Sequence, residues 1–468
     1  MTAFDLHHST LAIRNLLRNK RRSVSTLMTI IFGALAVLLF GGYAQSIRLG
    51  LETNIVRNGG HLQVQHPDFL LFGSGNLLDY TVTDYEEIVN ILRTDPLLAS
   101  RVNVISSSLS FNGIAGNFSA GLSKTVLAMG TVVSDQNVMR QWNEYKLPIP
   151  IREQKLVGNS QDTVVIGQGV ARILQLCNSL DVHECPRPSA HKHDSALPIT
   201  PTNIQGLAAE TMPKYAVSSG KRLEVLAVTP RGAPNVAELE VVNIERQGVR
   251  SFDDVYVGMH LKAAQRLVFG RAAPRVTAIL IQLIHGKDID LVRNRVQELL
   301  NLKFESQHLI VHDFRTLNPN FSQTVAMFDA IFGFISVLIA IIVIFTVSNT
   351  MSMAVVERTV EIGTLRAIGL REAGLRRVFV FEGLILGIVG AIAGLALALT
   401  LAQGLEALGV TWTPPGYVDP MPLNIAIWGQ WKIIIFTTMS LVGIAATSAW
   451  WPAKRAASLQ IVDALRYV

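Results

Sequence analysis

Ala330–Val356 reads AIFGFISVLIAIIVIFTVSNTMSMAVV, and this stretch decides the fold. It contains no Asp, Glu, Lys or Arg. It is also longer than the roughly 20 residues that an α-helix needs to cross a hydrocarbon core about 30 Å thick. Because backbone polar groups inside lipid must be paired within their own segment, a helix is the structure that suits such a run. The stretch predicts a transmembrane helix at residues 330–356.

Three further runs of this kind occur, and they are Ser23–Ile47, Gly383–Leu405 and Ile433–Ala453. The first follows a group of basic residues, as a cleavable signal would. However, the apolar region of a signal covers only about 7 to 15 residues, so we expect this run to span the membrane. The four runs predict four transmembrane helices, at residues 23–47, 330–356, 382–405 and 433–453.

The composition agrees with a membrane protein. Of the 468 residues, 49% are hydrophobic and 16% are charged, and the mean hydropathy is +0.35. Average proteins contain about 25% charged residues, so a disordered chain is excluded and an ordinary soluble enzyme is disfavoured. The net charge of +6 does not indicate nucleic-acid binding, because acidic and basic residues balance between Ile47 and Asp329.

Basic residues beside the spans predict the orientation, since Lys and Arg in short flanks stay on the cytoplasmic side. They precede the first span, lie between the second and third spans, and follow the fourth. These residues are Arg14, Arg18, Lys20, Arg21, Arg22, Arg358, Arg366, Arg371, Arg376, Arg377, Lys454, Arg455 and Arg466. Both termini are therefore expected in the cytoplasm, with the protein in the inner membrane.

One large extracytoplasmic domain, residues 48–329, is expected between the first two spans. The remaining segments are an amphipathic N-terminal helix on the inner membrane surface or a plain basic flank (1–22), a cytoplasmic coupling segment (357–381), an extracytoplasmic loop (406–432) and a cytoplasmic tail (454–468).

The large domain is predicted to be mixed α/β, with two lobes separated by the Pro-, Gly- and Ser-rich stretch Pro186–Gly220. Periodicity predicts helices at 81–93 and 287–302 and strands at 102–110, 124–133, 222–228, 238–245 and 276–283. A strand followed by a helix is expected over Thr163–Leu176.

Four glycines in the third span, Gly383, Gly387, Gly390 and Gly394, are spaced by four, three and four residues. At 3.6 residues per turn they share one face, where the missing side chains allow close approach of another helix. We interpret them as packing residues. Their spacing leaves open whether the neighbouring helix belongs to this chain or to a second copy.

The sequence offers no energy source of its own. The stretch Gly116–Thr125 resembles a phosphate-binding loop, but two extra residues precede its lysine and it falls in the extracytoplasmic domain. The spans carry no mid-membrane charge, which disfavours an ion-driven carrier. No catalytic constellation stands out, so we expect a non-catalytic subunit that depends on a separate protein for energy.

The cytoplasmic link contains Glu357-Arg-Thr-Val-Glu-Ile-Gly-Thr-Leu-Arg-Ala-Ile-Gly369, which predicts a short charged helix between two spans. Gly369 is placed to end that helix in a left-handed cap. A solvated positive loop is the alternative. A helix in this position could transmit a push from a cytoplasmic partner to the spans.

Residues 357–394, ERTVEIGTLRAIGLREAGLRRVFVFEGLILGIVGAIAG, resemble the coupling segment of FtsX-like permeases, the membrane subunits of MacB-type ABC transporters. LAIRNLLRNKRRSVSTLMTI near the start and WPAKRAASLQIVDALR near the end resemble the same family. VVIGQGVARILQL and DDVYVGMHLKAAQRLV resemble parts of its extracytoplasmic domain. The fused ATPase of MacB is absent from these 468 residues.

The resemblance implies a pair of permease chains, identical or related, with two copies of a cytoplasmic ATPase that binds ATP and Mg. This chain is expected to bind no cofactor itself, and further partners would be membrane lipid and a periplasmic adaptor or lipoprotein. The motif positions that the resemblance assigns to ATPase coupling, as contacts or shape-setting residues, are Glu357, Arg358, Glu361, Gly363, Arg366 and Gly369.

The two cysteines, Cys177 and Cys185, lie in the predicted periplasmic domain. In an oxidising compartment they could form a disulfide. Two free thiols are the second possibility. A zinc or copper site is the third, because the neighbouring side chains include metal-binding types, His183, Glu184, His191, His193 and Asp194.

Two functions fit this organisation. The first is ATP-driven export or extraction of a lipoprotein, lipid, peptide or drug by the extracytoplasmic domain. The second is signalling of the FtsX kind, in which the permease regulates cell-wall hydrolases and transports nothing. The large domain at residues 48–329 favours export, since the signalling type has a much smaller one. The stretch VRSFDDVYVGMHLKAAQRLV is similar to lipoprotein-releasing permeases in particular.

Overall fold

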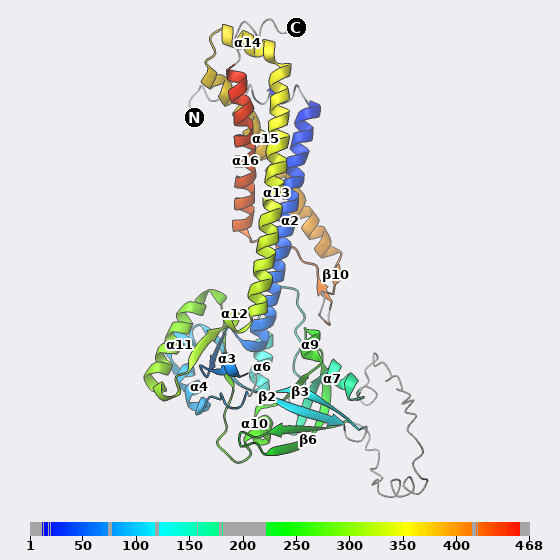
Figure 1. Ribbon diagram of the computed structural model, residues 1–468, viewed down its shortest axis with the longest axis vertical. Helices are drawn as coiled ribbons and strands as arrows, with labels where there is room; N and C mark the ends of the chain where they lie inside the picture. Colours follow the sequence, from blue (N-terminus) through cyan, green and yellow to red (C-terminus); the bar gives the residue numbers. More distant parts are fainter. Residues whose placement is uncertain are drawn as a thin grey trace, which may run out of the picture. The chain divides into compact units, whose positions relative to one another are not determined.

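The computed structural model describes residues 12, 14–16, 18, 20–73, 77–117, 121–156, 158–176, 180, 221–413, 418 and 420–458 (Figure 1). The chain divides into two compact units. The first, which we call the helical unit, comprises Met1–Leu51, Asn320–Trp412 and Pro422–Val468. The second, the α/β unit, comprises Glu52–Pro319 and Thr413–Met421.

Four long helices confirm the four predicted spans. They are α2 (Lys20–Gly59), α13 (Pro319–Glu357), α15 (Glu372–Ala407) and α16 (Trp431–Ala457), and each is long and apolar enough to cross a membrane. The helices extend beyond the predicted spans because a helix does not end where its apolar run ends. Residues such as Arg48 and Glu52 continue α2 without a break. The membrane boundaries at residues 23–47, 330–356, 382–405 and 433–453 stay predictions.

The helical unit has a core of aliphatic and small residues from all four helices. Ile30 and Ala34 of α2, Val343 of α13, and Ala445 and Ala449 of α16 are almost completely buried in it. Small side chains allow close backbone approach, which favours helix association in a membrane.

The four glycines of α15 contact two helices of this same chain. A Cβ atom at Gly383 would lie 2.7 Å from Ala449 Cβ, and one at Gly387 would lie 3.0 Å from Ala445 Cβ, both in α16. A Cβ atom at Gly394 would instead lie 2.5 Å from Ala34 Cβ in α2. The neighbours that the sequence left open are α16 for the first pair of glycines and α2 for the second.

In its described residues, the α/β unit is built on nine strands of one sheet. Their order is β3-β7-β4-β6-β5-β2-β8-β1-β9, with an additional pairing between β3 and β2. The strands are β1 (Leu62–Gln65), β2 (Val102–Asn117), β3 (Leu122–Thr131), β4 (Thr163–Gly167), β5 (Arg222–Val228), β6 (Pro234–Glu245), β7 (Tyr256–His260), β8 (Ala278–Leu283) and β9 (Ile310–Asp313). The mixed α/β class is confirmed.

The long strand β2 joins two groups of strands. Its first half, Val102–Ser108, pairs with β8 and so continues to β1 and β9. Its second half, Ser108–Asn117, pairs with β3, and within it Gly113–Gly116 pairs with β5. Because β3 continues through β7, β4 and β6 back to β5, these six strands form a closed ring.

The predicted boundary between the lobes was wrong. Strand β4 precedes the stretch Pro186–Gly220 and β5 follows it, and both belong to the same closed ring. The two groups of strands are instead linked within β2. The stretch Pro186–Gly220 itself lies outside the described residues.

Helices cover the two groups of strands. Helix α4 (Tyr85–Thr94) buries Tyr85, Ile88 and Leu92, which follow the spacing of one helical face. The other short helices of this unit are α3 (Phe69–Phe72), α5 (Pro96–Ala99), α6 (Val133–Arg140), α7 (Gln168–Ile173), α9 (Arg250–Asp253), α10 (Leu261–Phe269), α11 (Ile289–Lys303) and α12 (Phe314–Leu317), with 3-10 turns at Gly286–Asp288 and Glu305–Gln307. A small pairing joins β10 (Thr411–Trp412) and β11 (Met421–Pro422).

Asp253 connects the two family-like stretches of this unit. Its carboxylate accepts hydrogen bonds from the backbone N–H groups of Gln168 and Gly169 at the start of α7, at 3.2 and 3.0 Å. A Cβ atom at Gly167 would overlap the carbonyl oxygen of Asp253. The glycines of VVIGQGVARILQL are therefore needed because DDVYVGMHLKAAQRLV packs directly against them.

We expect Gly394→Ala to destabilise the helical unit by about 1 to 3 kcal/mol, because the added methyl group overpacks the contact with Ala34 and with the carbonyl oxygen of Ile31. Thermal unfolding in mild detergent measures this. Gly443→Ala in α16 is the matched control, since nothing lies within 4 Å of its Cβ position. Equal unfolding midpoints for the two variants would contradict the packing role.

Candidate functional site

The predicted coupling helix is present as α14 (Thr359–Ala367), between α13 and α15 (Figure 1). It is separated from α13 by Arg358, whose backbone angles of φ −110° and ψ 18° are not helical. At its other end Gly369 has a φ of +102°, while the N–H of Leu370 donates to the carbonyl of Leu365 at 3.0 Å. This confirms the left-handed cap, and the solvated-loop alternative was wrong for this segment.

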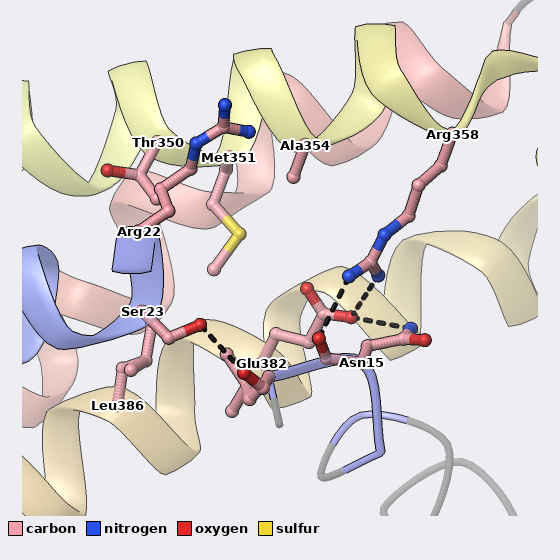
Figure 2. A pocket seen from close by; sticks show the side chains of 10 residues that line it. Asn15, Arg22, Ser23, Thr350, Met351, Ala354, Arg358, Glu382 and Leu386 are labelled. Carbon is pink, nitrogen blue, oxygen red and sulfur yellow. Dashed lines mark hydrogen bonds and ion pairs between the residues drawn. The ribbon is translucent and has the colours of Figure 1, made fainter. Parts of the chain in front are cut away.

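A buried ion pair lies at the break between α13 and α14 (Figure 2). Arg358 and Glu382 of α15 are 8% and 2% exposed, and Arg358 Nη1 lies 3.5 Å from Glu382 Oε1. Asn15 completes the group: its side-chain Nδ2 donates to Glu382 Oε1 at 2.8 Å, and its backbone carbonyl accepts from Arg358 Nη2 at 2.9 Å. Removing two charges from water is costly, and these extra hydrogen bonds offset part of that cost.

We call Asn15, Arg358 and Glu382 the joint. They come from three separate parts of the chain and meet beside a pocket lined also by Leu16, Arg22, Ser23, Thr350, Met351, Ala354 and Leu386 (Figure 2). The joint therefore fixes where α13 ends relative to the start of α15. Because Arg358 directly precedes α14, the joint also fixes the point at which α14 begins.

More exposed ion pairs surround the joint. Arg22 contacts Glu357 through both guanidinium nitrogens, with Nη1 2.7 Å from Oε2. Arg18 Nη2 lies 2.6 Å from Glu361 Oε1 in α14. On the far side of α14, Arg366 Nη1 donates to the carbonyl of Ala457 in α16 at 3.0 Å. Each end of α14 is thus bonded to a different helix.

The structure divides the six predicted coupling residues into three groups. Arg358 and Gly363 are buried, so they shape the segment and present no surface. Glu357, Glu361 and Arg366 are partly exposed and form the ion pairs around α14. Gly369 ends the helix. Whether any of them touches an ATPase stays a prediction.

Sequence reasoning missed Asn15 and Glu382 as members of this site. One feature of the sequence could have identified Glu382. It is an acidic residue at the edge of an apolar run, directly before the glycine face. Asn15 had no such signal. Its partner is 367 positions away in the sequence, so only the fold brings the two together.

The outward side of α14 combines apolar and polar groups. Val360 is 46% exposed, Leu365 is 42% exposed, and Ile368, directly after the helix, is 80% exposed. Thr364 and Glu361 lie among them and are also exposed. We call these five residues the outer face of α14.

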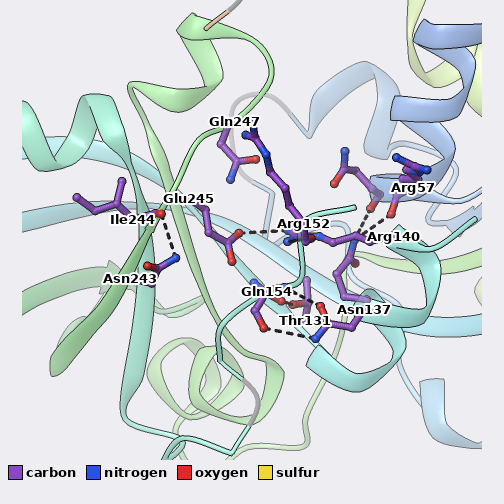
Figure 3. Close-up of polar contacts among 12 residues, drawn as sticks. Arg57, Thr131, Asn137, Arg140, Arg152, Gln154, Asn243, Ile244, Glu245 and Gln247 are labelled. Carbon is purple, nitrogen blue, oxygen red and sulfur yellow. Dashed lines mark hydrogen bonds and ion pairs between the residues drawn. The ribbon is translucent and has the colours of Figure 1, made fainter. Parts of the chain in front are cut away.

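A second polar group lies in the α/β unit (Figure 3). Arg140 of α6 lies 3.2 Å from Glu245 of β6 in a nearly buried ion pair, and its Nη1 donates to the carbonyl of Arg152 at 3.1 Å. Gln154 N–H donates to Asn137 Oδ1 at 2.7 Å. These contacts fasten the segment that follows α6 to the closed ring of strands.

Burial is the main cause of the pKa shifts of the Tyr256 and His61 side chains in the α/β unit. It raises the pKa of Tyr256, and it lowers the pKa of His61 to about 3. His61 is therefore neutral at physiological pH, and its Nδ1 accepts a hydrogen bond from the N–H of Leu283 at 3.0 Å. These groups have structural roles, and neither provides an acid or base for catalysis near pH 7.

The last turns of α2, Glu52–Gly59, belong to the α/β unit and are held firmly in it. Arg57 Nε donates to the carbonyl of Trp142 at 2.7 Å, and Gln136 donates to the carbonyl of Arg57 at 3.2 Å. The hydroxyl of Tyr145 donates to Glu52 Oε1 at 2.8 Å. These contacts hold the last turns of α2 within the α/β unit.

Cys177 and Cys185 lie outside the described residues, as do the neighbouring histidines, so the disulfide, the free thiols and the metal site all stay predictions. Among the residues that the structure does describe, no group of three or more His, Cys, Asp or Glu side chains is arranged to hold a metal ion.

Most of the helical unit's second half matches a known protein family. Residues 333–461, which run from α13 through α14 and α15 to the end of α16, match the family described as FtsX-like permease C-terminal. The helical unit contains an FtsX-like permease domain. The family resemblance proposed from the sequence is therefore confirmed.

Curated relatives include three ABC permeases. An uncharacterized ABC transporter permease of Methanocaldococcus jannaschii is 26% identical over 49% of this chain and 55% of its own. The lipoprotein-releasing system transmembrane protein LolC of Xylella fastidiosa is 27% identical over 34% of this chain and 40% of its own. The macrolide export ATP-binding/permease protein MacB of Syntrophobacter fumaroxidans is 22% identical over 97% of this chain and 63% of its own. The chain thus spans about half the length of these relatives.

We expect Glu382→Ala to lower the free energy of unfolding by about 3 kcal/mol, because it leaves the Arg358 charge buried without its partner. The double variant Arg358→Met with Glu382→Met should recover most of that loss, since a buried ion pair can be replaced by apolar groups of similar volume. Unfolding in mild detergent measures both. Arg18→Ala, which breaks an exposed pair, is the control and should change stability little. A Glu382→Ala variant as stable as the control would contradict the buried joint.

Proposed function

We propose that this chain is the permease subunit of an ABC transporter and that a separate cytoplasmic ATPase binds the outer face of α14. The observation that supports this most directly is the exposure of Ile368 and Leu365 on the outer face of α14. Apolar side chains on a short helix are suited to fill a groove on a partner. The FtsX-like permease domain agrees with this assignment.

The proposed orientation places α14 in the cytoplasm of a cell with an inner membrane. Lys454 and Arg455 near the end of α16, and Arg371, Arg376 and Arg377 at the start of α15, supply the positive charge that favours this side. The α/β unit then lies in the periplasm, and both termini lie in the cytoplasm. An ATPase in the cytoplasm can reach α14 in this arrangement.

The proposed mechanism transmits motion and carries no substrate through the bundle. Closure of the ATPase subunits on ATP would move α14, and the joint would pass this motion to α13 and α15. Helices α2 and α13 are each continuous over their whole length. The α/β unit would respond by changing how tightly it binds a cargo.

The full assembly that we propose contains two permease chains, identical or related, and two ATPase subunits that hold ATP and Mg. Helix α13 offers surface for the second permease chain or for lipid, because Phe334 and Phe345 are 68% and 74% exposed. This chain itself would bind no cofactor.

The proposed cargo is a lipoprotein, lipid, peptide or drug that the α/β unit takes from the periplasm or the outer leaflet, directly or through a periplasmic adaptor. Relatives named for lipoprotein release and for macrolide export support this class of cargo. Regulation of cell-wall hydrolases without transport is the second candidate. It is less favoured, because the α/β unit extends over Glu52–Pro319 and provides a large surface for cargo.

Co-purification tests the proposal. The tagged chain, isolated in mild detergent, should carry an ATPase, and Ile368→Asp should reduce the bound ATPase about tenfold or more, since a charge on an apolar interface residue costs upward of about 1.4 kcal/mol. Leu408→Asp is the matched control, because Leu408 is 76% exposed but follows the other end of α15. Absence of any nucleotide hydrolase from the wild-type preparation, or equal binding by both variants, would contradict the proposal.

A further inference from the structure

The segment before α2 and the first turn of α2 make polar contacts with the region around α14. The described residues of the segment, 12, 14–16 and 18, are helical and lead into α2. Asn15 and Arg18 lie in this segment, and Arg22 lies in the first turn of α2. Sequence alone suggested only a helix on the membrane surface or a basic flank. We call these three residues the N-terminal face.

Each residue of the N-terminal face bonds to a different acidic residue. Asn15 donates to Glu382 of α15 at 2.8 Å. Arg22 contacts Glu357, the last residue of α13, and Arg18 lies 2.6 Å from Glu361 in α14.

The three acidic residues that receive these bonds lie on three successive helices. A single short segment therefore holds the end of α13, the first turn of α14 and the start of α15 at once. This pattern fixes the position of α14, because a rotation of α14 would separate at least one of the pairs.

The contacts of the N-terminal face differ in burial and therefore in strength. Glu382 is buried, whereas Arg18 and Glu361 have side chains that are 65% and 45% exposed. Exposed pairs are weak and are screened by salt. The buried contact with Asn15 thus anchors the segment, while the exposed pair with α14 can open and close at small cost. A helix that must move when a partner pushes on it needs a contact of this second kind.

We propose that the N-terminal face is a positioning element that holds α14 in the orientation in which the partner meets it. The proposal rests on the proposed function for the identity of that partner. It adds Asn15, Arg18 and Arg22 to the residues that determine coupling. None of the three lies on the outer face of α14, so they act through α14 and not by contact with the ATPase.

Amide hydrogen exchange on the purified full chain in nanodiscs tests the proposal without any partner present. Arg18→Glu should speed exchange of the α14 amides by about two- to fivefold, as expected for the loss of one exposed pair. The double variant Arg18→Glu with Glu361→Arg restores the opposite charges and should return exchange to the wild-type rate. Arg22→Glu and its combination with Glu357→Arg repeat the test on the second pair.

Arg21→Glu is the matched control. Arg21 is exposed and makes no ion pair with any residue in the described part of the chain, and the variant has the same effect on the positive charge that orients the protein in the membrane. Unchanged exchange in the single reversals, failure of the charge swaps to restore it, or an equal effect of Arg21→Glu would each overturn the proposal. Failure of an ATPase to co-purify would defeat the proposed function, while this exchange comparison would still decide the role of the N-terminal face.

Discussion

The arrangement of the helical unit depends on a pair of opposite charges that are removed from water where α13 gives way to α14. Arg358 and Glu382 are nearly inaccessible, so each needs the other and its hydrogen bond with Asn15, which donates to Glu382 and accepts from Arg358. This requirement brings the N-terminal segment, the end of α13 and the start of α15 to one point. The position of α14 follows, because Arg358 is the residue at which the chain turns into it.

Close packing between the helices then determines how the rest of the bundle is arranged. The glycine face of α15 holds α16 with its first pair of residues and α2 with its second pair. Helix α2 is therefore packed against α15 in the helical unit.

Sequence patterns predicted the elements with strong local signals. Long apolar runs identified the four long helices, and glycine spacing identified the packing face of α15. The ends of the helices were not predictable from apolar character, since α2 continues through Arg48 and Glu52. Short strands such as β1 and β9 gave too few residues for a pattern to appear. The link between the two groups of strands was misplaced, because one strand, β2, pairs with different neighbours along its length.

The candidate site was predicted only in part, because local sequence patterns do not reveal contacts between distant parts of the chain. Motif positions around α14 could be recognised locally, and the cap at Gly369 followed from its place after the helix. The roles of Arg358 and Arg18 could not be read locally. The first bonds to Asn15 and the second pairs with Glu361, and both of these partners are hundreds of positions away in the sequence.

Site-specific photocrosslinking in living cells tests the central claim most directly. A benzophenone side chain in place of Ile368 would report whatever lies against the outer face of α14, because this position is 80% exposed. The account predicts a crosslinked product that contains a cytoplasmic nucleotide-hydrolysing protein. A product that contains only periplasmic proteins, or no protein product at all, would contradict it.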